Sequence, residues 1–200
     1  MATLAETRLK KALERTGAAR SSELEAAGIS RTQIARLVAA GKLHKIGRGL
    51  YARPDYQGTE HSALIAVAKR APQVVFCLLT ALRFHELTTQ SPSEVWIAIG
   101  NKEHPPRLDY PPLRTVRFSE TSLRQGVEVT VVDGVPLQVT NPAKTVADCF
   151  KFRNKVGLDV ALEALKEVRR ERKASADDLW RYANVNRVAN VMRPYLEAIA

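Results

Sequence analysis

Two helix-start signals in close succession constrain the N-terminal part of this chain more than any other feature. Ser22 and Glu25 have the spacing of a capping box, in which each side chain accepts a hydrogen bond from the other residue's backbone N–H. The same pattern recurs at Ser30 and Gln33, two residues after Gly28, which is placed to end the first of the two helices. Two helices joined by so tight a turn predict a helix-turn-helix.

The flanking residues predict a complete small domain around this motif. A preceding helix, with Leu9 and Leu13 on its inner face, is expected to end at Gly17. After Gly41, two short apolar segments at residues 43–46 and 50–52 flank Gly47-Arg48-Gly49 and predict a β-hairpin. A hairpin beside a helix-turn-helix is a wing, so we predict a winged helix-turn-helix domain over residues 1–55.

A polar connector at residues 54–58 leads to a larger predicted domain, residues 59–200. Asp133-Gly134 predicts a hairpin between two of its strands. Asn141-Pro142 predicts the cap and first turn of a helix that runs to residue 152. Strands are expected at residues 95–99, 115–118, 127–132 and 135–139, and further helices at residues 60–70, 75–87, 158–172, 176–182 and 185–199. The predicted class is α+β, with a small, mostly antiparallel sheet and several C-terminal helices.

The charge of the chain indicates a polyanionic partner. Thirty-one Lys and Arg residues against twenty-one Asp and Glu residues give a formal net charge of +10. Residues 26–54 contain basic side chains and no carboxylate, and Glu25 and Asp55 bracket this segment. Such a strip suits a phosphate backbone, and a solvated basic face without a ligand is the alternative interpretation.

The helix that begins after Ser30 supplies the candidates for reading DNA bases. At 100° per residue, Thr32 and Arg36 fall nearly opposite Ile34, and Gln33 lies on the flank. Arginine pairs bidentately with guanine and glutamine with adenine, whereas Arg31 in the first turn is expected to meet a phosphate. Arg48 at the hairpin tip is the candidate for the minor groove. The predicted DNA-binding residues are Arg31, Thr32, Gln33, Arg36, Lys42, Lys45, Arg48 and Arg53.

A second basic region lies at the end of the helix predicted at residues 158–172. Cations are favoured near any helix C-terminus, and additional contact with DNA, RNA or a protein is the alternative. Its residues are Lys166, Arg169, Arg170, Arg172 and Lys173.

Enzymatic and metal-dependent functions find little support, so we expect neither an enzyme nor a cofactor. The four histidines are dispersed without metal-ligand spacing, and His85 is expected to pack in the core or form a local hydrogen bond. The carboxylates available to a nuclease lack an adjacent lysine, although a DNA-targeted processing enzyme stays open as an alternative. These carboxylates are Glu94, Glu128 and Asp133.

The remaining features predict a cytoplasmic protein. Cys77 and Cys149 lie in apolar segments without nearby ligand pairs and are expected to be buried, reduced thiols. The longest apolar run, residues 74–79, is too short to cross a bilayer, and the first residues do not resemble a secretory signal.

Several segments in order along the chain resemble the AbiEi-type antitoxins. They are the winged helix, Cys77-Leu78-Leu79-Thr80-Ala81-Leu82 with His85-Glu86-Leu87-Thr88, Val95-Trp96-Ile97-Ala98-Ile99, Asn141-Pro142-Ala143-Lys144-Thr145-Val146-Ala147-Asp148, and Arg193-Pro194-Tyr195-Leu196-Glu197-Ala198. The resemblance implies an antitoxin of a bacterial abortive-infection, type IV toxin–antitoxin system used in phage defence. In that family the winged helix binds inverted repeats in its own promoter and represses the operon.

The resemblance also implies a functional partner. The C-terminal domain of the family counters a nucleotidyltransferase toxin without a stable complex between the two proteins. A stand-alone regulator, whose second domain senses a ligand or binds a protein, is the alternative within the same architecture.

Overall fold

The computed structural model describes residues 4–13, 18–47, 49–54, 61–108 and 111–198. Two compact units are present, one formed by residues 1–66 with 131–135 and the other by residues 67–130 with 136–200. Each unit has a hydrophobic core of its own.

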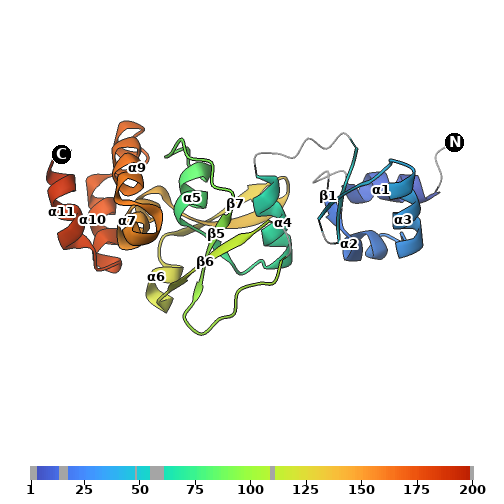
Figure 1. Ribbon diagram of the computed structural model, residues 1–200, viewed down its shortest axis with the longest axis horizontal. Helices are drawn as coiled ribbons and strands as arrows, with labels where there is room; N and C mark the ends of the chain where they lie inside the picture. The colour runs from blue at the N-terminus through green and yellow to red at the C-terminus, as the bar shows by residue number, and fades with distance from the viewer. Residues whose placement is uncertain (1–3, 14–17, 48, 55–60, 109–110, 199–200) are drawn as a thin grey trace. The chain divides into compact units, whose positions relative to one another are not determined.

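In the N-terminal unit, three helices lie on one side of a three-stranded antiparallel sheet (Figure 1). The wing hairpin predicted from the sequence is confirmed as β2 and β3, and β3 is the central strand of the sheet. The additional strand β1 was not predicted, because Ala-Ala-Arg has little intrinsic preference for a strand. The elements are α1 (Leu4–Leu13), β1 (Ala18–Arg20), α2 (Ser21–Ala26), α3 (Arg31–Ala39), β2 (His44–Gly47) and β3 (Leu50–Ala52).

The turn between α2 and α3 is built from two consecutive capping motifs. Gly28, at φ +80°, donates its N–H to Glu25 O, and Ile29 donates to Leu24 O, which is the Schellman pattern for ending a helix. The Ser30 N–H then donates to Gln33 Oε1 at 2.9 Å, and the Gln33 N–H donates to Ser30 Oγ at 3.3 Å. The capping box predicted for the start of α3 is therefore confirmed.

The capping box predicted at Ser22 and Glu25 is wrong. Helix α2 begins at Ser21, and the Arg20 N–H donates to the Glu23 carboxylate at 2.6 Å. The helix starts earlier because β1 ends at Arg20 and the Ser21 N–H is already bonded to Gly49 O in the wing. Glu25 is consequently available for another partner.

The larger unit contains a five-stranded sheet in the order β6-β5-β4-β8-β7. Its sheet is mixed rather than mostly antiparallel, because β4 pairs parallel to β8 and β5 pairs parallel to β6. Asp133 and Gly134 both have positive φ angles in the predicted two-residue turn between β7 and β8. The strands are β4 (Val75–Phe76), β5 (Val95–Gly100), β6 (Leu113–Phe118), β7 (Val127–Val132) and β8 (Val135–Thr140).

The helix predicted at residues 75–87 is wrong in its first part. Val75 and Phe76 form β4, which pairs with β5 on one side and β8 on the other. Helix α5 (Leu78–Phe84) starts only after this strand. A short apolar run has no periodicity that separates a buried strand from a buried helix, so β4 could not be distinguished in the sequence.

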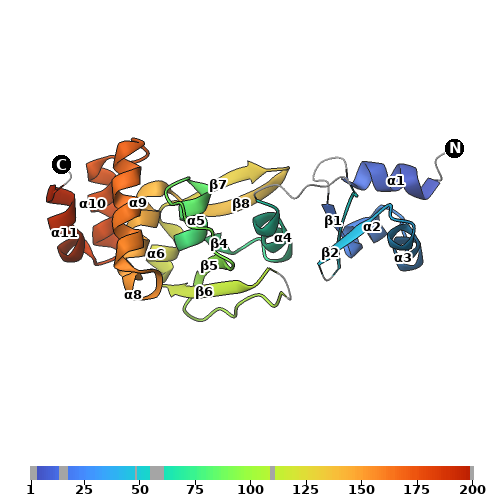
Figure 2. The same cartoon turned by 45° about the horizontal axis from the view of Figure 1, so that its top comes forward.

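The C-terminal helices gather at one end of the sheet (Figure 2), and α7 packs against α5, α9, α10 and α11. Asn141 caps α7 with Pro142 in its first turn, as predicted. The last two helices are separated at residues 186–188, so Asn186 lies in a turn and not inside the predicted final helix. The remaining helices are α4 (Ser62–Arg70), α6 (Glu120–Arg124), α7 (Pro142–Lys151), α8 (Arg153–Val156), α9 (Leu158–Arg170), α10 (Ala176–Val185) and α11 (Ala189–Ala198).

The caps give a first testable prediction. Ser30→Ala removes the acceptor for the Gln33 N–H and should destabilise α3 by about 1 kcal/mol. Ser22→Ala is the matched control, because Ser22 lies inside α2 and should cost less than about 0.5 kcal/mol. Amide hydrogen exchange across residues 31–39 measures both. Equal protection in the two variants would contradict the assigned cap.

Candidate nucleic-acid interface and buried charge network

Helix α3 separates an apolar inner face from a slim, exposed outer face. Ile34 and Leu37 are buried in the core of the N-terminal unit, and Val38 packs against the same core. Thr32 and Arg36 are exposed, as the helical spacing predicted. Ala35 and Ala39 are also exposed. Ala35 lies three residues after Thr32 and Ala39 three residues after Arg36, so α3 carries small side chains at these two positions of its exposed side.

Arg31 has a partner that the sequence analysis did not predict. Its Nε donates to Glu25 Oε1 at 2.6 Å, although the Arg31 side chain is 85% exposed. The bond joins the end of α2 to the start of α3. Because Glu25 holds one edge of the guanidinium, the remaining N–H groups stay available to an external phosphate.

The side chain of Gln33 is engaged in the cap of α3. Its side-chain oxygen accepts the Ser30 N–H, so bidentate pairing with adenine would require Gln33 to leave the cap. Its predicted role as a base reader is therefore weakened by the geometry. Thr32 and Arg36 are the predicted residues of α3 whose side chains are exposed on the outer face.

The wing is tied to the helix-turn-helix through the backbone. Ser21 at the start of α2 donates its N–H to Gly49 O at 2.9 Å, and Gly49 has a φ of +66°. Lys45 on β2 lies opposite Tyr51 on β3, and its side chain is exposed. Lys42 and Arg53 are exposed as well, whereas Arg48 lies outside the described residues.

The second predicted basic region is partly neutralised by neighbouring acids. Arg170 pairs with Glu167 and Glu171. Lys173 donates to His85 O at 2.6 Å and lies 3.5 Å from Glu86. Arg172 occupies the left-handed position that ends α9, at φ +52°. Lys166 is exposed, and Arg169 is half-buried.

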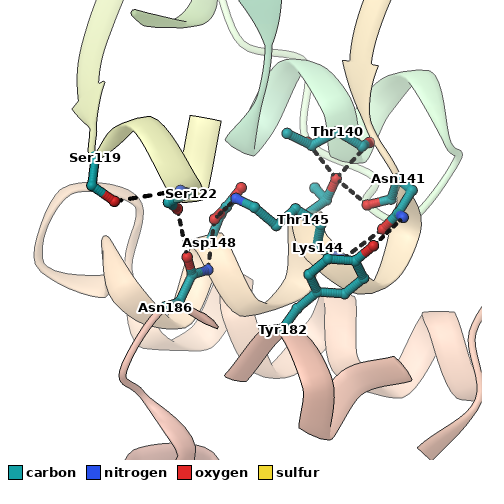
Figure 3. A network of polar contacts seen from close by, with 9 residues as sticks. All are labelled: Ser119, Ser122, Thr140, Asn141, Lys144, Thr145, Asp148, Tyr182 and Asn186. Carbon is teal, nitrogen blue, oxygen red and sulfur yellow. Dashed lines mark hydrogen bonds and ion pairs between the residues drawn. The ribbon is translucent and has the colours of Figure 1, made fainter. Parts of the chain in front are cut away.

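The larger unit contains a buried ion pair within a network of polar contacts (Figure 3). Lys144 Nζ donates to Asp148 Oδ1 at 2.5 Å, and both side chains are fully buried. The same carboxylate oxygen accepts from Asn186 Nδ2 at 2.7 Å, and Ser122 donates to Asn186 Oδ1 at 2.8 Å. This network connects α7 with α6 and with the turn between α10 and α11.

The electrostatics of this pair depend on its burial. Burial raises the pKa of Asp148, and the Lys144 ammonium group opposes that shift. Lys144 Nζ also lies 4.4 Å from the centre of the Phe118 ring, a cation–π distance. Asp148 Oδ2 is buried and has no hydrogen-bond partner among the described residues. Lys144 and Asp148 therefore form a buried ion pair that is part of this core.

His85 and the two cysteines of this unit are part of its packing. His85 Nε2 is 2.7 Å from Thr140 O, so its hydrogen bond is to a residue distant in the sequence and not a local one, and burial lowers the pKa of His85. Cys77 and Cys149 are buried free thiols, as predicted, and burial raises the pKa of each. Within the described ranges, His, Cys, Asp and Glu form no group of three that could hold a metal ion.

Among the described helices, none combines the length and apolar character needed to cross a membrane.

Sequence reasoning missed three features of these sites. Glu25 was assigned to a cap, and its pairing with Arg31 across the turn depends on where α2 begins. Lys144 and Asp148 belong to a segment that resembles the antitoxin family, and their i, i+4 spacing inside an apolar helix is the signal that indicates an ion pair. No sequence pattern indicates that Asn186 bonds to Asp148 and Ser122, because this role depends on the position of the turn between α10 and α11.

Comparison with known proteins confirms the predicted resemblance for the N-terminal unit. Residues 8–54 match the sequence model of a family described as "Transcriptional regulator, AbiEi antitoxin". These residues contain the helix-turn-helix and both strands of the wing. The description names a regulator and antitoxin and does not name an enzyme.

The fold of the chain is similar to that of a solved structure. The crystal structure of the RV2827C protein from Mycobacterium tuberculosis aligns with a TM-score of 0.61 at 14% sequence identity. The alignment covers 92% of this chain and 72% of that chain. At this identity the likeness concerns the fold alone. No curated protein matches the sequence.

The buried pair gives a second prediction. Lys144→Met leaves the Asp148 carboxylate buried without its cation and should lower the free energy of unfolding by about 3–5 kcal/mol. Adding Asp148→Asn should recover part of this loss because it removes the uncompensated charge. Both tryptophans, Trp96 and Trp180, lie in the larger unit, so denaturant unfolding followed by fluorescence reports on it.

Lys155→Met at an exposed site is the control for Lys144→Met. If both substitutions cost the same, Lys144 and Asp148 do not stabilise each other.

Proposed function

We propose that this protein is a DNA-binding transcriptional autorepressor and the antitoxin of a type IV toxin–antitoxin system in phage defence. Residues 1–55 bind inverted repeats in its own promoter in the cytoplasm. Residues 59–200 counter a nucleotidyltransferase toxin without a stable complex. The observation that carries the regulatory part is the family match over residues 8–54, which coincides with an exposed Arg36 on the outer face of α3.

The geometry of α3 supports major-groove binding. Its inner face is fixed by Ile34 and Leu37 in the core, so its outer face has one orientation relative to the unit. Small side chains at Ala35 and Ala39 permit close approach to base edges, and Arg36 is long enough to pair with guanine. Arg31, held by Glu25, supplies a phosphate contact at the N-terminus of the same helix.

The wing supplies contacts that do not depend on sequence. Lys45 is exposed on β2 and next to Tyr51 across the hairpin. Lys42 and Arg53 extend the positive surface at either end of the wing, and Arg48 is proposed for the minor groove. Phosphate contacts release counterions, so binding to DNA should weaken steeply as salt rises.

The third prediction separates base reading from phosphate contact. Arg36→Ala should cost about 1–3 kcal/mol on the upstream DNA of its own gene and reduce sequence preference. Lys45→Ala should weaken binding to specific and random duplexes alike, because a lysine–phosphate contact carries no base information. Mobility-shift titrations over a salt series measure both. Salt-insensitive binding without preference for the upstream DNA would contradict the proposed repressor.

The antitoxin function requires a separate experiment with the full chain. Arg36→Ala should weaken repression and still protect cells that express the neighbouring toxin gene, because the two functions are assigned to different domains. Lys144→Met, which disrupts the larger unit, should show the opposite pattern. It should lose protection and keep repression. If neither the wild type nor Arg36→Ala protects cells, the protein is a stand-alone regulator.

A further inference from the structure

A cationic segment at the end of α7 was not among the predicted sites. Residues 149–158 contain Lys151, Arg153 and Lys155 and no carboxylate. Arg187, in the turn between α10 and α11, lies close enough to Lys151 to influence it electrostatically. Within the described ranges, none of these four cations forms an ion pair with an acid.

Two aromatic rings hold part of this segment in place. Phe118 and Phe152 stack with ring centres 5.4 Å apart. Lys151 Nζ lies 5.8 Å from the Phe118 ring centre, and Lys155 Nζ lies 5.8 Å from the Phe152 ring centre. The two ammonium groups therefore lie within cation–π distance of one stacked aromatic pair, which favours these positions before any ligand binds.

The buried carboxylate of Asp148 does not neutralise the cations at the end of α7, because it is already paired with Lys144. Lys144, Asp148 and Lys151 lie on one face of α7 at positions i, i+4 and i+7. The first two are buried and form an ion pair, whereas Lys151 is half-buried near the end of the helix and has no acidic partner in that pair. Burial lowers the pKa of half-buried Lys151, and the positive charges of Lys144 and Arg187 lower it further, against the effect of Asp148. An anion placed here would relieve this repulsion.

Arg187 is fixed by the same buried network. Its neighbour Asn186 donates to Asp148 Oδ1 on α7. The Arg187 N–H donates to Asn184 O at 3.0 Å, and its φ is +59°, so the residue closes α10 in a defined backbone conformation. The side chain of Arg187 is exposed beyond this anchored turn.

We propose that Lys151, Lys155 and Arg187 form a second binding surface for the phosphate backbone of DNA. Several separated cations without acids suit consecutive phosphates, whereas a single small anion is bound by converging donors. The surface contrasts with the predicted region at the end of α9, where Arg170 and Lys173 already have acidic neighbours. The inference rests on the proposed DNA-binding function and adds a contact made by the larger unit.

The test compares two double variants of the full chain that lose the same charge. Lys155→Gln with Arg187→Gln removes two exposed cations of the proposed surface and leaves half-buried Lys151 intact. Arg170→Gln with Lys173→Gln is the matched control at the other basic region, where both cations already have acidic neighbours. Thermal unfolding of each variant verifies that the fold is retained. Affinity for the upstream duplex and for a random duplex is measured over a salt series.

The first double variant should reduce the slope of log affinity against log salt by about 1.8, which corresponds to two lost phosphate contacts. Its affinity for the random duplex at low salt should fall about tenfold or more, and the control should retain the wild-type slope. An unchanged slope in the first variant overturns the proposal, as does an equal change in both variants, which would reflect net charge alone.

This outcome is distinguishable from failure of the proposed function. If the wild type shows no preference for the upstream duplex, the repressor is rejected, and the difference in slope on the random duplex still decides the second surface. If the wild type prefers the upstream duplex and the slopes of the two variants agree, only the second surface is rejected.

Discussion

The two hydrogen bonds exchanged by Ser30 and Gln33 fix the start of α3, and the DNA-binding geometry of this protein depends on that point. The Schellman turn at Gly28 ends α2 only two residues earlier, so the angle between the helices is set by the backbone. Ile34 and Leu37 then fix the rotation of α3 about its axis. Arg36 reaches the outer face because these constraints act together.

The larger unit is organised by a different kind of constraint. A fully buried lysine and aspartate are costly unless each finds a partner, and α7 supplies both within one turn. Asn186 and Ser122 satisfy the same network from other elements. Because Asn186 belongs to the turn that presents Arg187, the internal pair also determines where an external cation stands.

The sequence predicts those parts of the structure that are set by local interactions. The cap at Ser30, the turn at Asp133-Gly134 and the cap at Asn141 are each decided by a few neighbouring residues. The start of α2 was misplaced because it depends on Ser21 bonding to Gly49, which is distant in sequence.

Long-range pairing explains the other differences. The sequence predicts helix at strand β4 because the identity of this segment depends on its partners in β5 and β8. The partner of Arg31 and the role of Asn186 likewise follow from tertiary contacts. The basic strip and the exposed side of α3 were predictable, because charge and helical periodicity are properties of the sequence itself.

The outer face of α3 is tested most directly by photo-crosslinking of the full chain. A benzophenone amino acid in place of exposed Ala35 should crosslink to the upstream DNA of the protein's own gene. The same group in place of exposed Lys11 on α1 should give no specific product. Crosslinking from position 11 with none from position 35 would contradict the assignment of α3 as the helix that reads DNA.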